Sequence, residues 1–126
     1  MAKKIKVLIV DDDPEMLLLL RAMLPSEWCT SLSASDGEQA LTLARAEHPD
    51  VILLDLMLPG MNGLNVLKEL RTDSKTADTP IIVLTAKYVT AEEHQLLDGY
   101  IQGLMSKTAL TPQSLLAELG RLEMLR

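Results

Sequence analysis

The sequence has few residues that support chemistry based on thiols, imidazole rings or aromatic surfaces. Among its 126 residues are one cysteine, two histidines and no phenylalanine, and aromatic residues make up 2%. The lone Cys29 excludes an internal disulfide and a paired-cysteine metal site, which agrees with a reducing compartment, and we expect it to be a small buried or half-buried residue. His48 lies beside a proline and His94 in a charged segment, so we expect both on the surface and neither in catalysis.

Positive charge is also scarce. Twelve lysine and arginine residues stand against 18 acidic ones, which gives a net charge of -6 and a pI near 4.8. Because affinity for nucleic acids depends largely on lysine and arginine, we expect no direct binding of nucleic acid. No apolar run is long enough to cross a membrane, and the run after the basic start is cut by Asp11 before it forms a signal-peptide core. We therefore expect no membrane association and a cytoplasmic location.

The length and the remaining composition indicate one domain. Hydrophobic residues make up 48% and charged residues 24%, both ordinary for a globular protein. A chain of this size buries roughly two thirds of the surface that its unfolded form exposes. We expect residues 1–126 to form a single domain without an effector domain. The closeness of Met1 to the first apolar run favours a true N-terminus, whereas the other end does not distinguish a stand-alone domain from an excised one.

Apolar runs alternate with segments of helical spacing. Continuous apolarity predicts strands buried on both faces at 5–10, 51–54, 81–84 and 101–105, and a short polar strand at 28–34 is placed by the rhythm of the others. Four helices have recognisable starts: Asp13 before Pro14, an S-x-x-E capping box of Ser35 and Glu38, Asn62 before Gly63, and Thr111 before Pro112.

This alternation predicts a doubly wound α/β fold. Five strand–helix units imply a parallel sheet with right-handed crossovers and helices on both faces, a (βα)5 three-layer sandwich of the flavodoxin-like type. With the strand order 2-1-3-4-5, strands one, three, four and five lie side by side. Ligands of such sheets bind beyond the carboxyl ends of the strands.

Reactive side chains stand at the carboxyl ends of four of these strands. Asp11 and Asp12 follow the first strand, Asp55 the third, Thr85 the fourth and Lys107 the fifth. Carboxylates held together raise each other's pKa unless a cation joins them, and Mg²⁺ prefers a few carboxylates with water and phosphate oxygens. A carboxylate can also attack a phosphoryl group, with the metal, the ammonium and the hydroxyl neutralising the charge. The pattern predicts phosphoryl-acceptor chemistry.

Each of these residues also has a structural interpretation. Helix N-termini favour carboxylates, but Asp13 is the expected cap, so the two aspartates before it exceed what capping requires. Asp55 interrupts an apolar run, where an unpaired carboxylate is costly. Thr85 is equally a strand former that satisfies a backbone group, and a lysine placed like Lys107 is usually solvated.

The motifs VDDDP, LLDLMLPGMNG, VLTA and SK, in this order and over essentially the whole chain, resemble the receiver domain of two-component response regulators. The resemblance implies the fold of the chemotaxis response regulator. It also implies that Asp55 is the phosphoacceptor and that Thr85 and Lys107 contact the phosphoryl oxygens.

The same resemblance implies a metal site. Asp12 would bind Mg²⁺ directly, Asp11 through water, and Asp55 and the main-chain carbonyl of Met57 would be further ligands, with Mn²⁺ able to substitute. A sensor histidine kinase or a histidine phosphotransfer domain would phosphorylate the chain and so change its binding to a downstream protein or effector domain. A phosphorylation-dependent homodimer is a candidate as well. The chain would be no enzyme beyond its own phosphorylation and slow dephosphorylation.

The sequence departs from the receiver pattern near the last strand. Leu104 occupies the position, three residues before the lysine, where receivers commonly carry a switch aromatic. Thr108 follows Lys107 where proline in a cis peptide is common, and a cis bond without proline costs about 3 kcal/mol, so this loop is either strained or differently shaped. Met57 and Lys87 flank the site at variable positions from which they would screen attacking water.

Alternative functions stay open. One is a receiver-like interaction module that is never phosphorylated. An aspartyl-phosphate phosphatase of the haloacid dehalogenase type is disfavoured, because Met57 stands where that family has a second aspartate. Nucleotide binding is disfavoured because the first turn lacks a glycine-rich phosphate loop. The segment 16–24 is too apolar to bury every side chain, so an exposed leucine there is a candidate docking point for a phosphodonor histidine domain.

Overall fold

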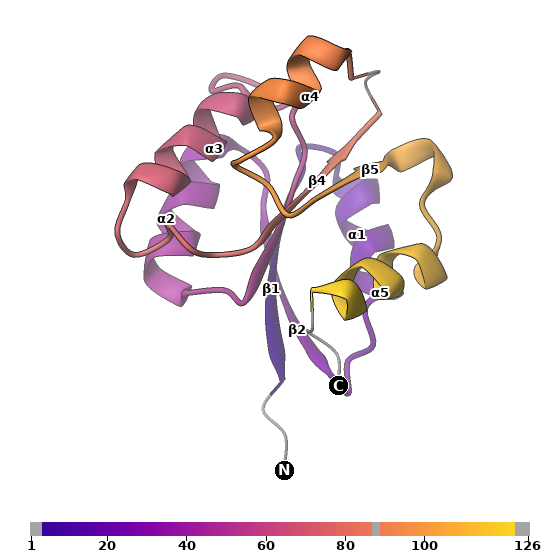
Figure 1. Ribbon diagram of the computed structural model, residues 1–126. Helices are drawn as coiled ribbons and strands as arrows, with labels where there is room; N and C mark the ends of the chain where they lie inside the picture. The colour runs from indigo at the N-terminus through magenta and orange to yellow at the C-terminus, as the bar shows by residue number, and fades with distance from the viewer. Residues whose placement is uncertain (1–3, 87–88, 123–126) are drawn as a thin grey trace.

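The computed structural model describes residues 4–86 and 89–122 and shows a five-stranded sheet between two layers of helices (Figure 1). The elements, in chain order, are β1 Ile5–Val10, α1 Pro14–Met23, β2 Cys29–Ala34, α2 Gly37–Glu47, β3 Val51–Leu54, α3 Gly63–Thr72, β4 Ile81–Thr85, α4 Ala91–Leu97, β5 Gly103–Ser106, the 3₁₀ turn η1 Lys107–Ala109 and α5 Pro112–Arg121. The sheet is parallel, with the order β2-β1-β3-β4-β5. The predicted doubly wound fold and its strand order are confirmed.

The sheet register aligns the carboxyl ends of the central strands. β1 pairs with β2 from Ile5 opposite Cys29 to Val10 opposite Ala34, and Val10 also lies opposite Leu54 of β3. The residues that follow β1 and β3 therefore emerge side by side. The polar β2 forms one edge of the sheet, which explains why a strand with few apolar residues is tolerated there.

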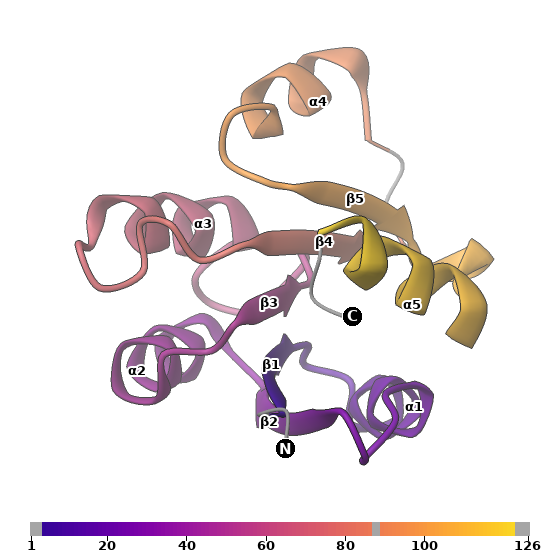
Figure 2. The same ribbon diagram turned by 60° about the horizontal axis from the view of Figure 1, so that its bottom comes forward.

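Successive strand residues point to opposite faces, and each face has its own core. α2, α3 and α4 cover one face, and α1 and α5 cover the other, which Figure 2 shows from a second direction. Strand residues buried toward the first layer are Leu8, Val10, Ile52, Leu54, Ile81 and Val83. Those buried toward the second are Val7, Ile9, Val51, Leu53, Ile82 and Leu84. This two-sided burial is the physical reason for the continuous apolar runs.

Three of the four predicted helix starts are confirmed. Asp13, Asn62 and Thr111 are N-caps whose side chains accept from backbone N–H groups of the first turn. The Ser35–Glu38 capping box is wrong. The next residue, Asp36, caps α2 and accepts from the Gln39 N–H at 2.8 Å. A carboxylate gains more than a hydroxyl from the positive end of the helix dipole, so the helix begins one residue later.

The last strand is shifted relative to the prediction of 101–105. β5 begins at Gly103 and extends to Ser106, which lies opposite Thr85. Gln102 precedes the strand and makes two hydrogen bonds with Ile81. Its backbone N–H donates to the Ile81 carbonyl at 2.8 Å, and its side-chain Oε1 accepts from the Ile81 N–H at 2.7 Å. Apolarity alone does not reveal such a side-chain contact at a strand start.

Several surface expectations agree with the structure. Cys29 is buried, which raises the pKa of its thiol, and His48 and His94 are exposed. In α1 the surplus of leucines leaves Leu18 68% and Leu19 49% exposed. None of the helices in the described ranges has the length and apolarity needed to cross a bilayer.

The single tryptophan, Trp28, lies at the amino end of the sheet. Its indole is about half exposed, and its carbonyl accepts from the N–H of Ile5 at 2.7 Å. It immediately precedes β2, so it stands at the end of the sheet opposite to the carboxyl ends of the strands.

Candidate phosphoryl-acceptor site

The carboxylates predicted from the sequence meet at the carboxyl end of the sheet. Asp11 directly follows β1, and its N–H donates to the Ala34 carbonyl at 3.0 Å. Asp55 directly follows β3, and its N–H donates to the Val10 carbonyl at 3.0 Å. The sheet hydrogen bonding therefore continues through both aspartates, which fixes their backbones next to each other.

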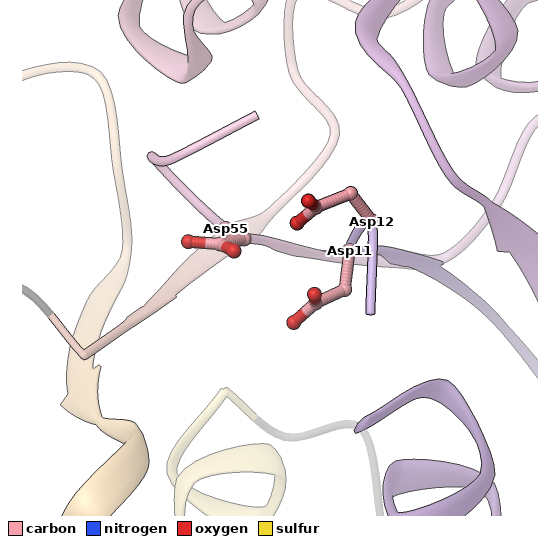
Figure 3. Close-up of side chains that lie close together, drawn as sticks. All are labelled: Asp11, Asp12 and Asp55. Carbon is pink, nitrogen blue, oxygen red and sulfur yellow. The ribbon is translucent and has the colours of Figure 1, made fainter. Parts of the chain in front are cut away.

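Three carboxylates form one cluster. Asp11, Asp12 and Asp55 each offer an oxygen, and these oxygens lie within 4.8 Å of one another. Figure 3 shows the side chains of Asp11 and Asp12 leaving the end of β1 and pointing toward the side on which Asp55 lies. Asp11 and Asp55 are buried, whereas Asp12 is exposed. A set of hard oxygen donors with one open side fits a magnesium ion that keeps part of its water shell.

Lys107 compensates the charge of the two buried carboxylates. Its Nζ lies 2.6 Å from Asp11 Oδ2 and 2.9 Å from Asp55 Oδ2, and the side chain is 16% exposed. Burial by itself lowers the pKa of Lys107, but hydrogen bonds and charge attraction from Asp11 and Asp55 outweigh it, so the pKa is raised. The ammonium is thus held in its charged form between the two aspartates.

Backbone amides orient the same two carboxylates. Asp11 Oδ1 accepts from the N–H of Asp13 at 2.9 Å, and Asp55 Oδ1 accepts from the N–H of Met57 at 3.0 Å. Each carboxylate therefore has one oxygen fixed by a main-chain donor two residues later and the other facing Lys107. This arrangement restricts both side chains to one orientation, as a reacting site requires.

Thr85 and Leu104 line the neighbouring part of the site. Thr85 ends β4 and is buried, at the same end of the sheet as the aspartates. Leu104 is half buried in β5 and packs toward the core under α2, α3 and α4. Both line a cavity of about 460 Å³ between β4, β5 and Val89. The carbonyl of Met57 follows Asp55 in the chain, and its role as a metal ligand stays a prediction, while Lys87 lies outside the described residues.

The loop after β5 is differently shaped rather than strained by a cis bond. The Lys107–Thr108 peptide is trans, and residues Lys107–Ala109 form the 3₁₀ turn η1. Ser106 caps this turn through its side chain, which accepts from the N–H of Thr108. The alternative left open by the sequence is therefore resolved in favour of a different loop geometry.

Gly63 is a supporting residue that motif reasoning did not assign. A Cβ at this position would lie 2.4 Å from the Leu56 Cα and 2.8 Å from the Asp55 carbonyl oxygen. The Gly63 N–H also donates to the Leu56 carbonyl at 3.0 Å. The start of α3 thus packs directly on the chain that follows Asp55. The Asn-Gly pair signals a helix start in the sequence, but the close approach depends on the tertiary fold.

Comparisons with known proteins agree on one family. The model of the response regulator receiver domain matches residues 7–119. The DNA-binding response regulator MtrA of Mycolicibacterium smegmatis is 47% identical over 87 residues, which cover 69% of this chain and 37% of that protein. The protein PilH of Pseudomonas aeruginosa is 40% identical over 82 residues, 65% of this chain and 68% of PilH. The chain thus matches little more than a third of the length of MtrA.

Solved structures give the same result. The chemotaxis protein CheY4 of Vibrio cholerae superposes with a TM-score of 0.86 at 31% identity, covering 94% of this chain and 98% of that one. The receiver domain of the sensor histidine kinase PA1611 of Pseudomonas aeruginosa superposes with a TM-score of 0.84 at 28% identity, covering 94% and 97%, and holds a magnesium ion in its active-site cleft. Fold, site geometry and sequence matches together show that the chain belongs to the receiver domains of response regulators.

Proposed function

We propose that Asp55 is the phosphoacceptor of a two-component phosphorelay. The observation that carries this proposal is the pair of buried carboxylates, Asp11 and Asp55, joined by one ammonium at 2.6 and 2.9 Å at the carboxyl end of a receiver fold. The sheet and two backbone amides hold these carboxylates in place before any ligand arrives. Such preorganisation suits charge that develops during phosphoryl transfer.

The metal ligands in this proposal are Asp11, Asp12, Asp55 and the main-chain carbonyl of Met57. The donor set is all oxygen, which fits Mg²⁺ and also Mn²⁺. When bound, the ion neutralises negative charge on the aspartates and on the incoming phosphoryl group. Asp12, exposed at the edge of the cluster, is the carboxylate with the most direct access to a hydrated ion.

The transfer step uses the side chains as follows. A carboxylate oxygen of Asp55 forms a bond to phosphorus while the bond from phosphorus to the donor breaks, and the donor leaves with that electron pair. The donor is the imidazole of a phosphohistidine or the acetate of acetyl phosphate. The Thr85 hydroxyl and the Lys107 ammonium then donate hydrogen bonds to the phosphoryl oxygens. Receiver domains are in general not enzymes of the classical kind, and this step modifies the chain itself.

The partners follow from the same chemistry. A sensor histidine kinase or a histidine phosphotransfer domain supplies the phosphoryl group, and exposed Leu18 and Leu19 on α1 provide an apolar contact for it. Phosphorylation of Asp55 in turn changes the face formed by α4, β5 and α5, and this face then binds a downstream protein, an effector domain or a second copy of the chain. We further propose that residues 1–126 act as a single receiver domain in the cytoplasm.

The experiment that tests this function is intact-protein mass spectrometry after incubation with acetyl phosphate, with and without Mg²⁺. The native chain should gain one phosphoryl group only when the metal is present, and Asp55→Asn should gain none. Asp13→Asn is the matched control, because the Asp13 side chain caps α1 and its contact with Asp11 is made by the backbone N–H, which asparagine keeps. No gain in mass together with no Mg²⁺ binding would favour the interaction module that is never phosphorylated.

A further inference from the structure

The turn that carries Lys107 is built differently from the proline turn that the receiver family leads one to expect. Lys107 is the first residue of η1, directly after β5, and is joined to Thr108 by a trans peptide. A proline at 108 would have no N–H to donate. In this chain Thr108 has a backbone N–H, which donates a hydrogen bond to Ser106 Oγ.

Two hydroxyl groups close this turn around Lys107. Ser106 Oγ accepts from the Thr108 N–H at 3.3 Å and lies 2.8 Å from Thr108 Oγ1 in a hydroxyl–hydroxyl hydrogen bond. Both contacts join the residue before Lys107 to the residue after it. Ser106 is itself the last residue of β5 and lies opposite Thr85 of β4. Ser106 therefore joins the turn to the sheet through β5, and its hydrogen bonds to Thr108 span Lys107.

The geometry of this turn decides where the long side chain of Lys107 can place its ammonium. Four methylene groups separate the backbone of Lys107 from its ammonium, and fixing such a chain costs rotamer entropy. The ammonium nevertheless makes two short contacts, 2.6 Å to Asp11 and 2.9 Å to Asp55. A backbone free to rotate at Lys107 would make both contacts together less frequent.

We propose that Ser106 and Thr108 are positioning residues for Lys107, and that their hydroxyl pair replaces the proline that commonly follows this lysine in receivers. Their hydroxyl groups hydrogen-bond to each other and not to the carboxylates. They fix the turn so that the ammonium reaches Asp11 and Asp55 at once. This inference rests on the proposed function for its catalytic consequence, although the positioning itself concerns the chain without any ligand.

The first test is made without metal and without a phosphodonor. The Lys107 ammonium is observed by ¹H–¹⁵N NMR, in which a lysine held by two carboxylates exchanges its protons more slowly than solvated lysines. Ser106→Ala should speed this exchange, whereas Ser106→Thr, which keeps the hydroxyl, should restore it. Ser26→Ala is the control, since Ser26 is an exposed serine between α1 and β2 at the amino end of the sheet. Unchanged exchange in Ser106→Ala would overturn the proposal.

The second test separates positioning from a general loss of stability. Ser106→Ala and Thr108→Val should slow phosphorylation by acetyl phosphate by roughly five- to tenfold, which corresponds to the loss of about one hydrogen bond. Mg²⁺ binding should become tighter, because a loosened ammonium competes less for Asp11 and Asp55. A variant that is only less stable would weaken both. Thr30→Val, on the exposed side of β2, is the control for Thr108→Val.

A double-mutant cycle with Lys107→Ala completes the design. If Ser106 acts through Lys107, then Ser106→Ala should have no further effect on rate or Mg²⁺ affinity once Lys107 is replaced. Independent, additive effects would contradict the proposal. If the native chain is not phosphorylated at all, the proposed function fails, while the NMR experiment still decides whether Ser106 and Thr108 position the lysine.

Discussion

The ammonium of Lys107 lies closer to Asp11 Oδ2, at 2.6 Å, than to Asp55 Oδ2, at 2.9 Å. The lysine is therefore shared between the metal-binding carboxylate and the phosphoacceptor of the proposed site. Removing it would leave two buried carboxylates facing each other without a cation, a situation that is strongly unfavourable in a protein interior.

Lys107→Ala is expected to lower the free energy of unfolding by about 2–3 kcal/mol in the absence of metal, less than for a fully buried pair because the side chain keeps some exposure. Added Mg²⁺ should recover more stability in this variant than in the native chain, because it replaces the missing positive charge. Urea unfolding with and without Mg²⁺ measures both effects. Lys68→Ala on the exposed side of α3 is the control, and equal recovery in the two variants would contradict the expectation.

Gly63→Ala should disturb the chain that follows Asp55. The added methyl would lie 2.4 Å from the Leu56 Cα, so either α3 or this segment must move. We expect a loss of stability of about 2 kcal/mol or more and weaker Mg²⁺ binding, measured by urea unfolding and calorimetry. Gly120→Ala is a matched control: a Cβ there meets nothing within 4 Å, and alanine in a helix should stabilise by about 0.5–1 kcal/mol.

Arg71 joins three segments at the amino end of the sheet. Its guanidinium donates to the carbonyls of Tyr100 at 2.8 Å and Thr79 at 2.7 Å, and to Gln102 Oε1 at 3.0 Å. Because one lysine ammonium cannot reproduce this planar set of donors, Arg71→Lys should cost about 2–3 kcal/mol, close to the cost of Arg71→Ala. Chemical denaturation measures this, with exposed Arg21→Lys as control. A nearly neutral Arg71→Lys would show that charge, not geometry, matters there.

Met57→Gln is expected to shorten the lifetime of the phosphoryl group on Asp55. The Met57 side chain is 59% exposed beside the site, while its N–H remains bound to Asp55 Oδ1 whatever the side chain. Replacing an apolar thioether by an amide of similar size admits water more readily to the acyl phosphate. The decay of phosphorylated protein after removal of the donor measures the effect. Identical decay in both proteins would refute the screening role.

Asp73 gives a prediction on pH. The N–H of Lys75 at 2.9 Å, and then the Arg45 side chain at 2.6 Å, lower the pKa of Asp73 below its usual value. A lowered pKa in the folded state means that the stabilisation is present above the unfolded value, about 3.9, and is lost as the pH falls through the folded value. In an NMR titration, Arg45→Gln should raise the Asp73 pKa only part of the way, since the backbone donor remains. An unchanged pKa would exclude the contribution of Arg45.

The sequence was sufficient to predict the architecture because strands that are buried on both faces, such as 51–54, appear in it as continuous apolar runs. It also located Asp11, Asp12 and Asp55, since parallel strands bring their carboxyl ends to one edge. It was harder to predict which of two neighbouring residues with similar chemistry takes a given structural role. Ser35 and Asp36 are both good N-caps, and only the three-dimensional position of the first turn decides between them.

Contacts made by long side chains or by close backbone approach were not predictable in the same way. The sequence placed Lys107 at the right edge, but its second contact, with Asp11, depends on how η1 directs a flexible side chain. Gly63 was visible only as part of a helix start, because nothing in an Asn-Gly pair says which backbone will lie against it. Both depend on distances between segments that are remote in the chain.

The position of Trp28 has a practical consequence for following this protein in solution. The only indole stands before β2, and the six residues of that strand separate it from the carboxyl end of the sheet by about 20 Å. Its emission should therefore report unfolding of the sheet edge and remain nearly silent when a metal or a phosphoryl group binds. A fluorescence assay of activation would need a second tryptophan near Asp55, and the native one would then serve as an internal reference for the folded state.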